Sequence, residues 1–296
     1  MPPTALSRVL HGAIDLHCHS GPSPFPRRID HAEAAEDAAR LEMRAILVKS
    51  HHHSTVTDVL SMKGRLEHLK TRVFGGIALN SQVGGINPAA VAMSLQMGGR
   101  AVWFPTFSAG QHIHCHPEDH GFPTSALDLP AEEVSIYGAD GELAPEVGQV
   151  LDMVAEADAM VTGGHLDPEG VRQVLTEGKR RGVARMLVNH PNFVVGADHD
   201  QVREYVRLGA YIEHSLAMYH PDTVGFGWDP RILLEWIDVV GPERTVLGSD
   251  LGQQKNPLPV DGFLKVGELL LDLGVSEADL RLMTVDNPAF LLGLND

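Results

Sequence analysis

Eight short apolar segments recur along the chain, and each ends in polar residues or glycine, as buried strands do. Successive segments begin about 25 to 35 residues apart, the spacing of strand–helix units, except for one gap of about 60 residues. We predict strands at Ala13–Cys18, Ala45–Lys49, Val73–Leu79, Ala101–Phe104, Met160–Gly164, Arg185–Asn189, Ala210–Glu213 and Thr245–Gly248.

The segments between these strands carry helical signals. One shows the spacing of an amphipathic helix in Val147, Val150, Leu151, Val154 and Ala155. Proline follows a capping side chain at four predicted helix starts, which are Asn87-Pro88, Asp167-Pro168, Asp229-Pro230 and Asn287-Pro288.

Eight strands alternating with helices predict an α/β fold, a (β/α)8 TIM barrel that residues 1–296 form as a single domain. The alternative is a doubly wound open sheet. Its nucleotide-binding form has no support, because neither GxGxxG nor GxxxxGK[ST] follows a predicted strand.

The long gap predicts an insertion after the fourth strand, from about Pro105 to Glu142. Within it, the residues from Val134 to Gly141 suggest a small hairpin or turn. The histidine-rich stretch Gln111–Pro117 is a candidate lid over the mouth of the barrel.

Composition narrows the classes of partner. The chain has 296 residues, is 43% apolar, and carries a formal net charge of −16, so we expect neither nucleic acid nor a membrane as a partner. No apolar run reaches the roughly 20 residues of a membrane span, and the first residues do not resemble a secretory signal. Two cysteines, Cys18 and Cys115, fit a reducing compartment, and we expect a cytoplasmic protein.

Seventeen histidines are an unusual number, and several of them stand at strand ends. His17 and His19 alternate with Cys18 at the end of the first strand, so both imidazoles point to one face and Cys18 to the other. Three further predicted strands are followed at once by His165, His190 and Asp250. Because strand ends of a barrel meet at one face, these five side chains are candidates for a shared metal site.

This pattern resembles the amidohydrolase superfamily of metal-dependent hydrolases, which carries His-x-His after strand one, His after strands five and six, and Asp after strand eight. The resemblance covers essentially the whole chain, including a C-terminal stretch (284–294) that is similar to the family's closing helix. It implies one or two divalent ions, with Zn²⁺ first and Mn²⁺, Fe²⁺ or Co²⁺ as alternatives. The implied ligands are His17, His19, His165 and Asp250, with His190 on a second ion or on the substrate.

Lys49 is a departure from the family pattern. Binuclear members supply a carboxylated lysine or a glutamate from strand four, where this chain has Trp103-Phe104 instead. Lys49 ends the second strand, and desolvation there would favour the neutral amine that reacts with carbon dioxide. Two interpretations stay open: a carboxylated Lys49 that ligates metal, or a lysine that pairs with a carboxylate such as Glu213 or contacts substrate.

Other residues are candidates for substrate binding. Arg27, next to Arg28, matches a carboxylate or a phosphate, and Glu213 follows the seventh strand as an acid facing the mouth. Most of the insertion's histidines are expected to be solvated, with one of them touching substrate or metal. The residues expected to bind substrate are His51, Glu213, His116 and Arg27. The histidines of the insertion are His112, His114, His116 and His120.

The resemblance implies a hydrolase in which metal-activated water cleaves an amide, imide, lactone or ester bond of a small molecule. Asp250 would carry the proton to the leaving group, and His190 would stabilise the oxyanion if it is not a ligand. A non-oxidative decarboxylase or isomerase of the same superfamily and a non-catalytic metal-binding protein are the alternatives. We also consider assembly into a homo-oligomer.

Overall fold

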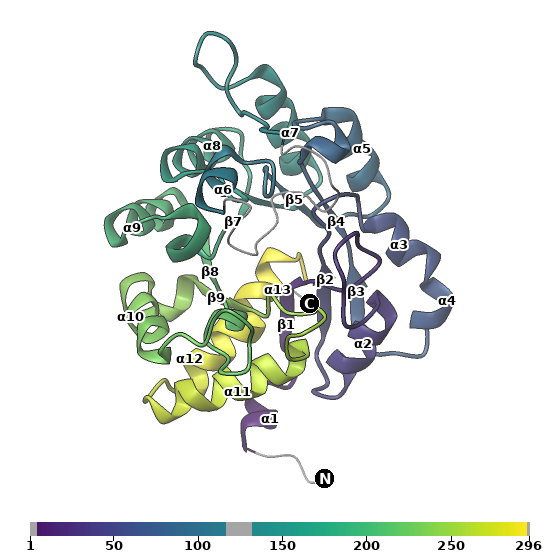
Figure 1. Cartoon of the computed structure of the whole chain (residues 1–296), viewed down its shortest axis with the longest axis vertical. Helices are drawn as coiled ribbons and strands as arrows, with labels where there is room; N and C mark the ends of the chain where they lie inside the picture. Colours follow the sequence, from purple (N-terminus) through teal and green to yellow (C-terminus); the bar gives the residue numbers. More distant parts are fainter. Residues whose placement is uncertain (1–4, 117–131, 295–296) are drawn as a thin grey trace.

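Strands and helices alternate along the whole computed structural model, which describes residues 5–116 and 132–294 (Figure 1). The strands are β1 Ile14–Cys18, β2 Ala45–Val48, β3 Arg72–Phe74, β4 Gly76–Ala78, β5 Ala101–Trp103, β6 Met160–Thr162, β7 Arg185–Asn189, β8 Tyr211–Ser215 and β9 Thr245–Gly248. The helices are α1 Ala5–Val9, α2 His31–Ala39, α3 Val56–Ser61, α4 Lys63–Leu66, α5 Pro88–Gln96, α6 Gly110–Cys115, α7 Pro145–Glu156, α8 Pro168–Arg180, α9 His199–Leu208, α10 Pro230–Val240, α11 Pro259–Asp272, α12 Glu277–Arg281 and α13 Asn287–Leu291.

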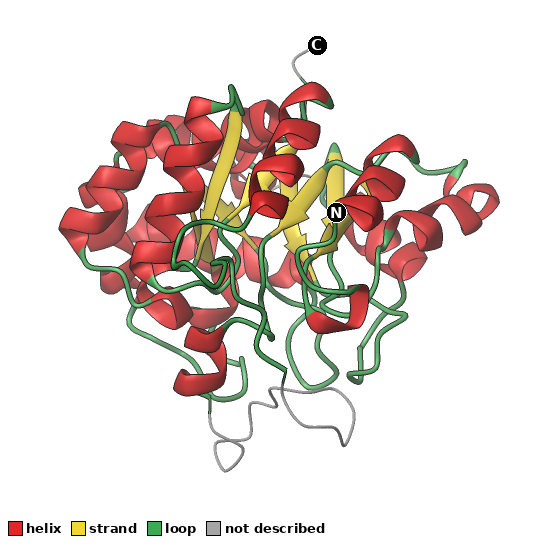
Figure 2. Ribbon diagram, turned by 90° about the horizontal axis from the view of Figure 1, so that it is seen from above, coloured by secondary structure: helices red, strands yellow, loops and turns green. Residues whose placement is uncertain are grey.

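All strand pairs are parallel, in the orders β1-β2-β3 and β4-β5-β6-β7-β8-β9. The third predicted strand is split into β3 and β4 at Gly75, where a Cβ atom would lie 2.7 Å from the backbone nitrogen of Val56. The last strand returns to the first, since Cys18 pairs with Leu251 and the His19 amide donates to the Leu251 carbonyl at 2.8 Å. The α/β fold with a TIM-like barrel is therefore confirmed, with helices surrounding the strands (Figure 2).

A helix begins at each of the four predicted proline-marked starts, and three of the four predicted capping side chains are confirmed. The side chains of Asn87, Asp167 and Asp229 accept hydrogen bonds from the first turns of α5, α8 and α10. The fourth, Asn287, is not a cap. Its amide instead donates to the Thr245 carbonyl at 2.7 Å, which ties α13 to the start of β9.

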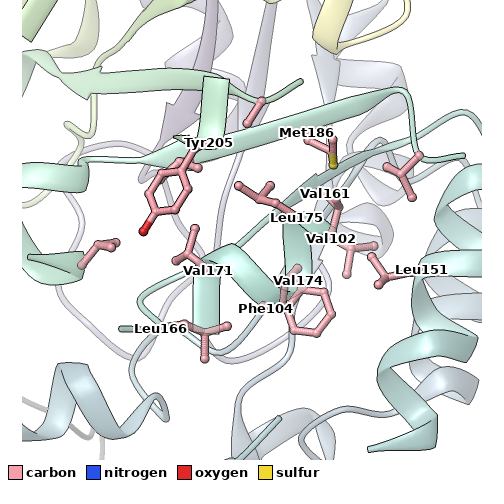
Figure 3. Close-up of a cluster of buried hydrophobic side chains, with 14 of the residues drawn as sticks. Val102, Phe104, Leu151, Val161, Leu166, Val171, Val174, Leu175, Met186 and Tyr205 are labelled. Atoms are coloured by element: carbon pink, nitrogen blue, oxygen red, sulfur yellow. The ribbon is translucent and has the colours of Figure 1, made fainter. Parts of the chain in front are cut away.

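Apolar side chains fill the space on both sides of the strands. Outside them, residues of β5, β6 and β7 pack against α7, α8 and α9, as Val102, Val161, Leu151, Val171 and Tyr205 illustrate (Figure 3). Inside, Ile14, Leu16, Leu47, Trp103 and Leu187 form a core that Ala289 and Leu291 of α13 extend at the amino ends of the strands. The predicted closing helix is thus present, and the carboxyl ends of the strands remain for a site.

The insertion after the fourth predicted strand, which is β5, contains α6 and a short antiparallel pairing of Tyr137 with Leu143. The pairing agrees with the predicted hairpin. His120 lies outside the described residues. None of the described helices is both long enough and apolar enough to cross a membrane.

Candidate metal centre

A cavity of about 280 Å³ opens at the carboxyl ends of the strands. Its lining includes most of the histidines that end predicted strands, together with Asp250, Lys49 and a set of apolar side chains. The lining residues are His17, His19, Phe25, Pro26, Arg27, Lys49, His51, Phe107, His112, His165, His190, Phe193, Val194, Ala217, Met218, Val224, Phe226, Asp250, Gln253 and Asn256. This is the face at which barrel enzymes carry their sites.

Three side chains in this cavity converge tightly. The Oδ1 atom of Asp250 lies 3.0 Å from Nε2 of His19 and 3.4 Å from Nε2 of His17. One ligand atom from each of the three lies within 4.8 Å of the others, which is close enough to share one metal ion. The site therefore brings the ends of β1 and β9 to one point.

The ionisation of these groups suits a divalent cation. Burial lowers the pKa of His17 and of His19 to about 3, so both imidazoles are neutral at pH 7, the form that binds metal. Burial opposes ionisation of Asp250, but charge interaction with His17 and the hydrogen bond with His19 outweigh it and hold the pKa of Asp250 well below its usual value. Two neutral imidazoles and one carboxylate fit Zn²⁺ and its neighbours in the first transition series.

Glu213 orients His17 from behind. Its Oε1 atom lies 2.6 Å from Nδ1 of His17 and accepts a hydrogen bond of 2.9 Å from the side-chain amide of Asn189. A histidine that gives Nδ1–H to a carboxylate presents Nε2, which is the atom facing Asp250. Glu213 is fully buried and does not line the cavity, so it supports His17 rather than facing a substrate as the sequence suggested.

Asp15 holds the two ligand-bearing strand ends together, and sequence reasoning missed it. Its carboxylate accepts from the backbone amides of His17 at 3.0 Å and Ser249 at 2.9 Å, and from the Ser249 hydroxyl at 2.5 Å. Burial raises the pKa of Asp15 to about 6. The signal was available, because an aspartate inside an otherwise apolar strand needs a specific partner.

Two of the predicted site residues have left-handed backbones. The φ angles are 52° at Asp250 and 29° at His190, a region that side chains other than glycine seldom adopt. Next to Asp250, Gly252 has a φ angle of 124°, and a Cβ atom there would lie 2.2 Å from the His19 carbonyl oxygen. Such conformations persist where the surrounding structure imposes them, and they concentrate at functional sites.

His165 and His190 line the same cavity but stand apart from the three converging ligands. Their ring centroids are 5.0 Å from each other, and that of His190 is 5.8 Å from that of His17. Neither belongs to the group that could share one ion among the described residues, so their predicted ligation stays a prediction. Nδ1 of His165 instead lies 2.9 Å from Nδ1 of His112.

Lys49 is buried against the first ligand. Its Nζ atom lies 3.0 Å from Nε2 of His17 and 5.6 Å from the ring centroid of Trp103. Burial lowers the pKa of Lys49 to about 8, in spite of the opposing charges of Asp250 and Glu213. The ion pair with Glu213 is not formed among the described residues, and carboxylation of Lys49 remains a prediction.

The insertion supplies His112 to the cavity instead of His116. Both are buried, His112 within α6 and His116 directly after its last residue. His116 packs against His112 with ring centroids 4.5 Å apart and does not line the cavity, and His114 is exposed. One turn of helix therefore separates the histidine that reaches the cavity from the one that supports it. Which of the two reaches the cavity depends on where α6 begins, and the periodicity of the strands carries no information on that.

His51 and Arg27 lie where the sequence suggested, in the cavity lining. Nδ1 of His51 is 2.8 Å from the Thr106 hydroxyl, and its ring stacks on Phe107 with centroids 3.9 Å apart. Cys18 is buried in the outer core, as its place opposite the two histidines predicts.

The chain shares its fold with enzymes of the amidohydrolase superfamily. An amidohydrolase from Pseudomonas aeruginosa has a TM-score of 0.64 at 11% identity, over 98% of this chain and 100% of that chain. The lactonase Lmo2620 from Listeria monocytogenes has a TM-score of 0.63 at 13% identity, over 97% and 96%. A 2,6-dihydroxybenzoate decarboxylase, complexed with 2,6-dihydroxybenzoate, has a TM-score of 0.56 at 12% identity, over 96% and 100%. The fold that the sequence resemblance implies is thereby confirmed.

Residues 12–213 match the model of a protein family described as "Family of unknown function (DUF6282)". The chain belongs to this family. The match ends at Glu213 and so includes His17, His19, His165 and His190 but not Asp250. No curated protein matched the chain.

Proposed function

We propose that this protein is a metal-dependent hydrolase of small molecules, with Zn²⁺ as its ion. The observation that carries the proposal is the convergence of His17, His19 and Asp250 from the first and last strands in one cavity. Support for the ligand role of His17 comes from Glu213, which fixes its ring as carboxylates do in zinc sites. A cavity of about 280 Å³ suits a small substrate.

A divalent ion in this site would supply Lewis acidity. That acidity polarises a carbonyl group and lowers the pKa of water, so that water becomes a nucleophile near neutral pH. The chain supplies the proton acceptor. Asp250 is ionised at neutral pH and faces the cavity, so its carboxylate can take the proton of the attacking water and pass it to the leaving group. The bond classes that we propose are amides, imides, lactones and esters.

His190 is the group that we propose for the developing oxyanion. Burial lowers the pKa of His190 to about 4, so the ring is neutral at pH 7 and can donate one N–H. Its Nδ1 atom has no hydrogen-bond partner among the described residues. A buried donor without a protein partner in a cavity wall is suited to a charge that forms only during reaction.

The test combines metal analysis with a panel of amides, imides, lactones and esters. We expect activity to disappear when a chelator removes the metal and to return with added Zn²⁺, and we expect His17→Ala to abolish it. Mn²⁺, Fe²⁺ and Co²⁺ in parallel identify the ion. Hydrolysis that survives complete metal removal would refute the proposal.

A non-oxidative decarboxylase is the second candidate, because only one three-residue ligand group is found in the described part of the chain. It would require a single ion and an unmodified Lys49. One ion per chain, together with release of carbon dioxide from carboxylic acids and no hydrolysis of the panel, would establish it instead. Isomerisation of a substrate by a protein with one ion per chain, again without hydrolysis of the panel, would establish an isomerase.

A metal store built from the insertion's histidines has less support. His112 pairs with His165, His114 is exposed, and His116 packs behind His112, so the three do not converge. Simultaneous replacement of these three by alanine is expected to leave most bound metal in place. Loss of most metal in that variant, with His17→Ala harmless, would favour storage.

A further inference from the structure

Arg27 lines the cavity within the electrostatic influence of Asp250, but its guanidinium forms no ion pair in the described part of the chain. The residue follows β1 in the chain, and its backbone pairs with Gln253, which lies close to Asp250 in sequence. No hydrogen bond or ion pair of its guanidinium is found in residues 5–116 and 132–294, and its Nε atom is buried and unpartnered. Burial lowers the pKa of Arg27 to about 10, so it stays a cation at neutral pH. A buried guanidinium N–H without a hydrogen-bond acceptor is costly unless a ligand supplies one.

Arg28 is different, although it is the neighbouring residue. Its side chain is exposed, so its charge is solvated. Its guanidinium donates a hydrogen bond of 2.6 Å to the Asn256 carbonyl, so one of its N–H groups already has a protein acceptor. The sequence placed both arginines in the loop after the first strand and made Arg27 the candidate for substrate binding. Only Arg27 lines the cavity.

The charge of the cavity lining is opposite in sign to the net charge of the whole chain. The chain carries a formal net charge of −16, yet its cavity lining contains Arg27 and Lys49 against a single acid, Asp250. A cationic pocket on an acidic protein attracts and orients anionic ligands selectively. A divalent ion among His17, His19 and Asp250 would strengthen this preference.

Much of the remaining lining is apolar, and it includes four phenylalanine rings. Phe25 lies two residues before Arg27 in the sequence, and its ring centroid is 6.0 Å from the guanidinium carbon. The faces of aromatic rings and aliphatic side chains pack against a flat, uncharged part of a ligand. The larger apolar side chains of the lining include Phe25, Phe107, Phe193, Met218, Val224 and Phe226.

We propose that the substrate is a compact aromatic carboxylate, whose carboxylate is held by Arg27 while its ring lies against the apolar wall. This inference rests on the proposed function of the same cavity. One planar guanidinium matches the two oxygens of a carboxylate. A phosphate would need additional donors, and the other cation of the lining, Lys49, is in contact with His17.

Binding of simple probes to the chelator-treated protein tests this without catalysis and without an ion that could hold the carboxylate. Dissociation constants for benzoate, benzamide and phenyl phosphate are measured by NMR titration. We expect benzoate to bind at least tenfold more tightly than benzamide, and phenyl phosphate to bind more weakly than benzoate. Arg27→Met is expected to weaken benzoate at least tenfold and to leave benzamide unchanged.

Two variants control the result. Arg28→Met removes the same charge from the adjacent position outside the cavity and is expected to keep the preference for benzoate. Arg27→Lys keeps the charge but loses the planar fork, so it is expected to bind benzoate with intermediate affinity, which also shows that the cavity still folds. Unchanged benzoate affinity in Arg27→Met overturns the inference, and tighter binding of phenyl phosphate overturns the assignment to a carboxylate.

The outcomes separate this inference from the proposed function. Preference for benzoate that depends on Arg27, in a protein without hydrolase activity, would refute the proposed function and leave the ligand class intact. Hydrolysis of neutral substrates, unaffected by Arg27→Met, would refute the ligand class and leave the hydrolase intact.

Discussion

Asp250 combines two properties at the scale of a single residue, a left-handed backbone with a φ angle of 52° and a carboxylate shared by two imidazoles. Asparagine adopts this backbone as readily as aspartate, so the Asp250→Asn change isolates the loss of charge. Replacing Asp250 by asparagine is therefore a direct test of the candidate metal centre.

We expect Asp250→Asn to lower metal affinity by at least tenfold, because even residues that only orient a ligand contribute roughly 10–100-fold. Metal content per chain after dialysis against a graded chelator measures the effect. Asp200→Asn is the matched control, since its carboxylate is exposed and paired with Arg203. Equal metal content in the two variants would remove Asp250 from the ligand set.

Asp15 is placed to contribute to stability through the buried groups that it pairs. Its replacement by alanine leaves the buried amides of His17 and Ser249 without an acceptor. We expect Asp15→Ala to lower the free energy of unfolding by about 2–4 kcal/mol, since each unsatisfied buried group costs about 1–3 kcal/mol. Urea titration at pH 7 measures it, with Asp200→Ala expected to change stability by about 0.5 kcal/mol or less.

At the scale of elements, the loop after β9 carries Asp250 and passes directly over the backbone of β1. Gly252 makes this approach possible, because it has no Cβ atom to meet the His19 carbonyl. The position of Asp250 relative to His19 therefore depends on a residue that has no side chain.

We expect Gly252→Ala to weaken metal binding at least tenfold and to lower stability, because the loop must move away from β1. Gly274→Ala is a close control. Its φ angle of 96° is also left-handed, but a Cβ atom there would meet nothing within 4 Å. Metal affinity measured in both variants separates backbone strain from the clash, and equal losses would contradict this account.

The sequence predicted most of the elements and the strand-end residues, because both follow from local periodicity. His17, His19 and Asp250 could be selected since each ends an apolar strand. The contact of Asp15 with Ser249 and that of His17 with Glu213 could not be predicted. Those partners lie on different strands, or just after one, and only the barrel brings them together. The choice of His112 over His116 likewise depended on the position of α6, which strand periodicity does not report.

At the scale of the whole molecule, many buried histidines make stability depend on pH. His214 is a clean example, because burial lowers its pKa from 6.5 to about 3 and neither ring nitrogen has a hydrogen-bond partner in the described part of the chain. Below pH 6.5 the unfolded chain takes up a proton that the native protein does not. The free energy of unfolding therefore rises with pH across this window.

We expect the metal-free protein to lose stability between pH 7 and pH 5, and His214→Leu to reduce that loss by about 2 kcal/mol, the linkage of one such histidine. Urea titrations at the two pH values measure it. His68→Leu, at an exposed position after α4, is the control for replacing a histidine by leucine on the surface. An identical loss in wild type and His214→Leu would show that His214 is protonated in the native state.

The pairing of the first strand with the last has a consequence for how the protein is made. A ribosome synthesises β1 long before β8 and β9, so the carboxylate of Asp15 and the ring of His17 leave the exit tunnel without Ser249, Glu213 or Asp250. Contacts so distant in the chain form late and slow folding. The nascent chain must therefore carry unpaired polar groups in its first strand until β8 and β9 have left the ribosome, and the cavity can be assembled only then.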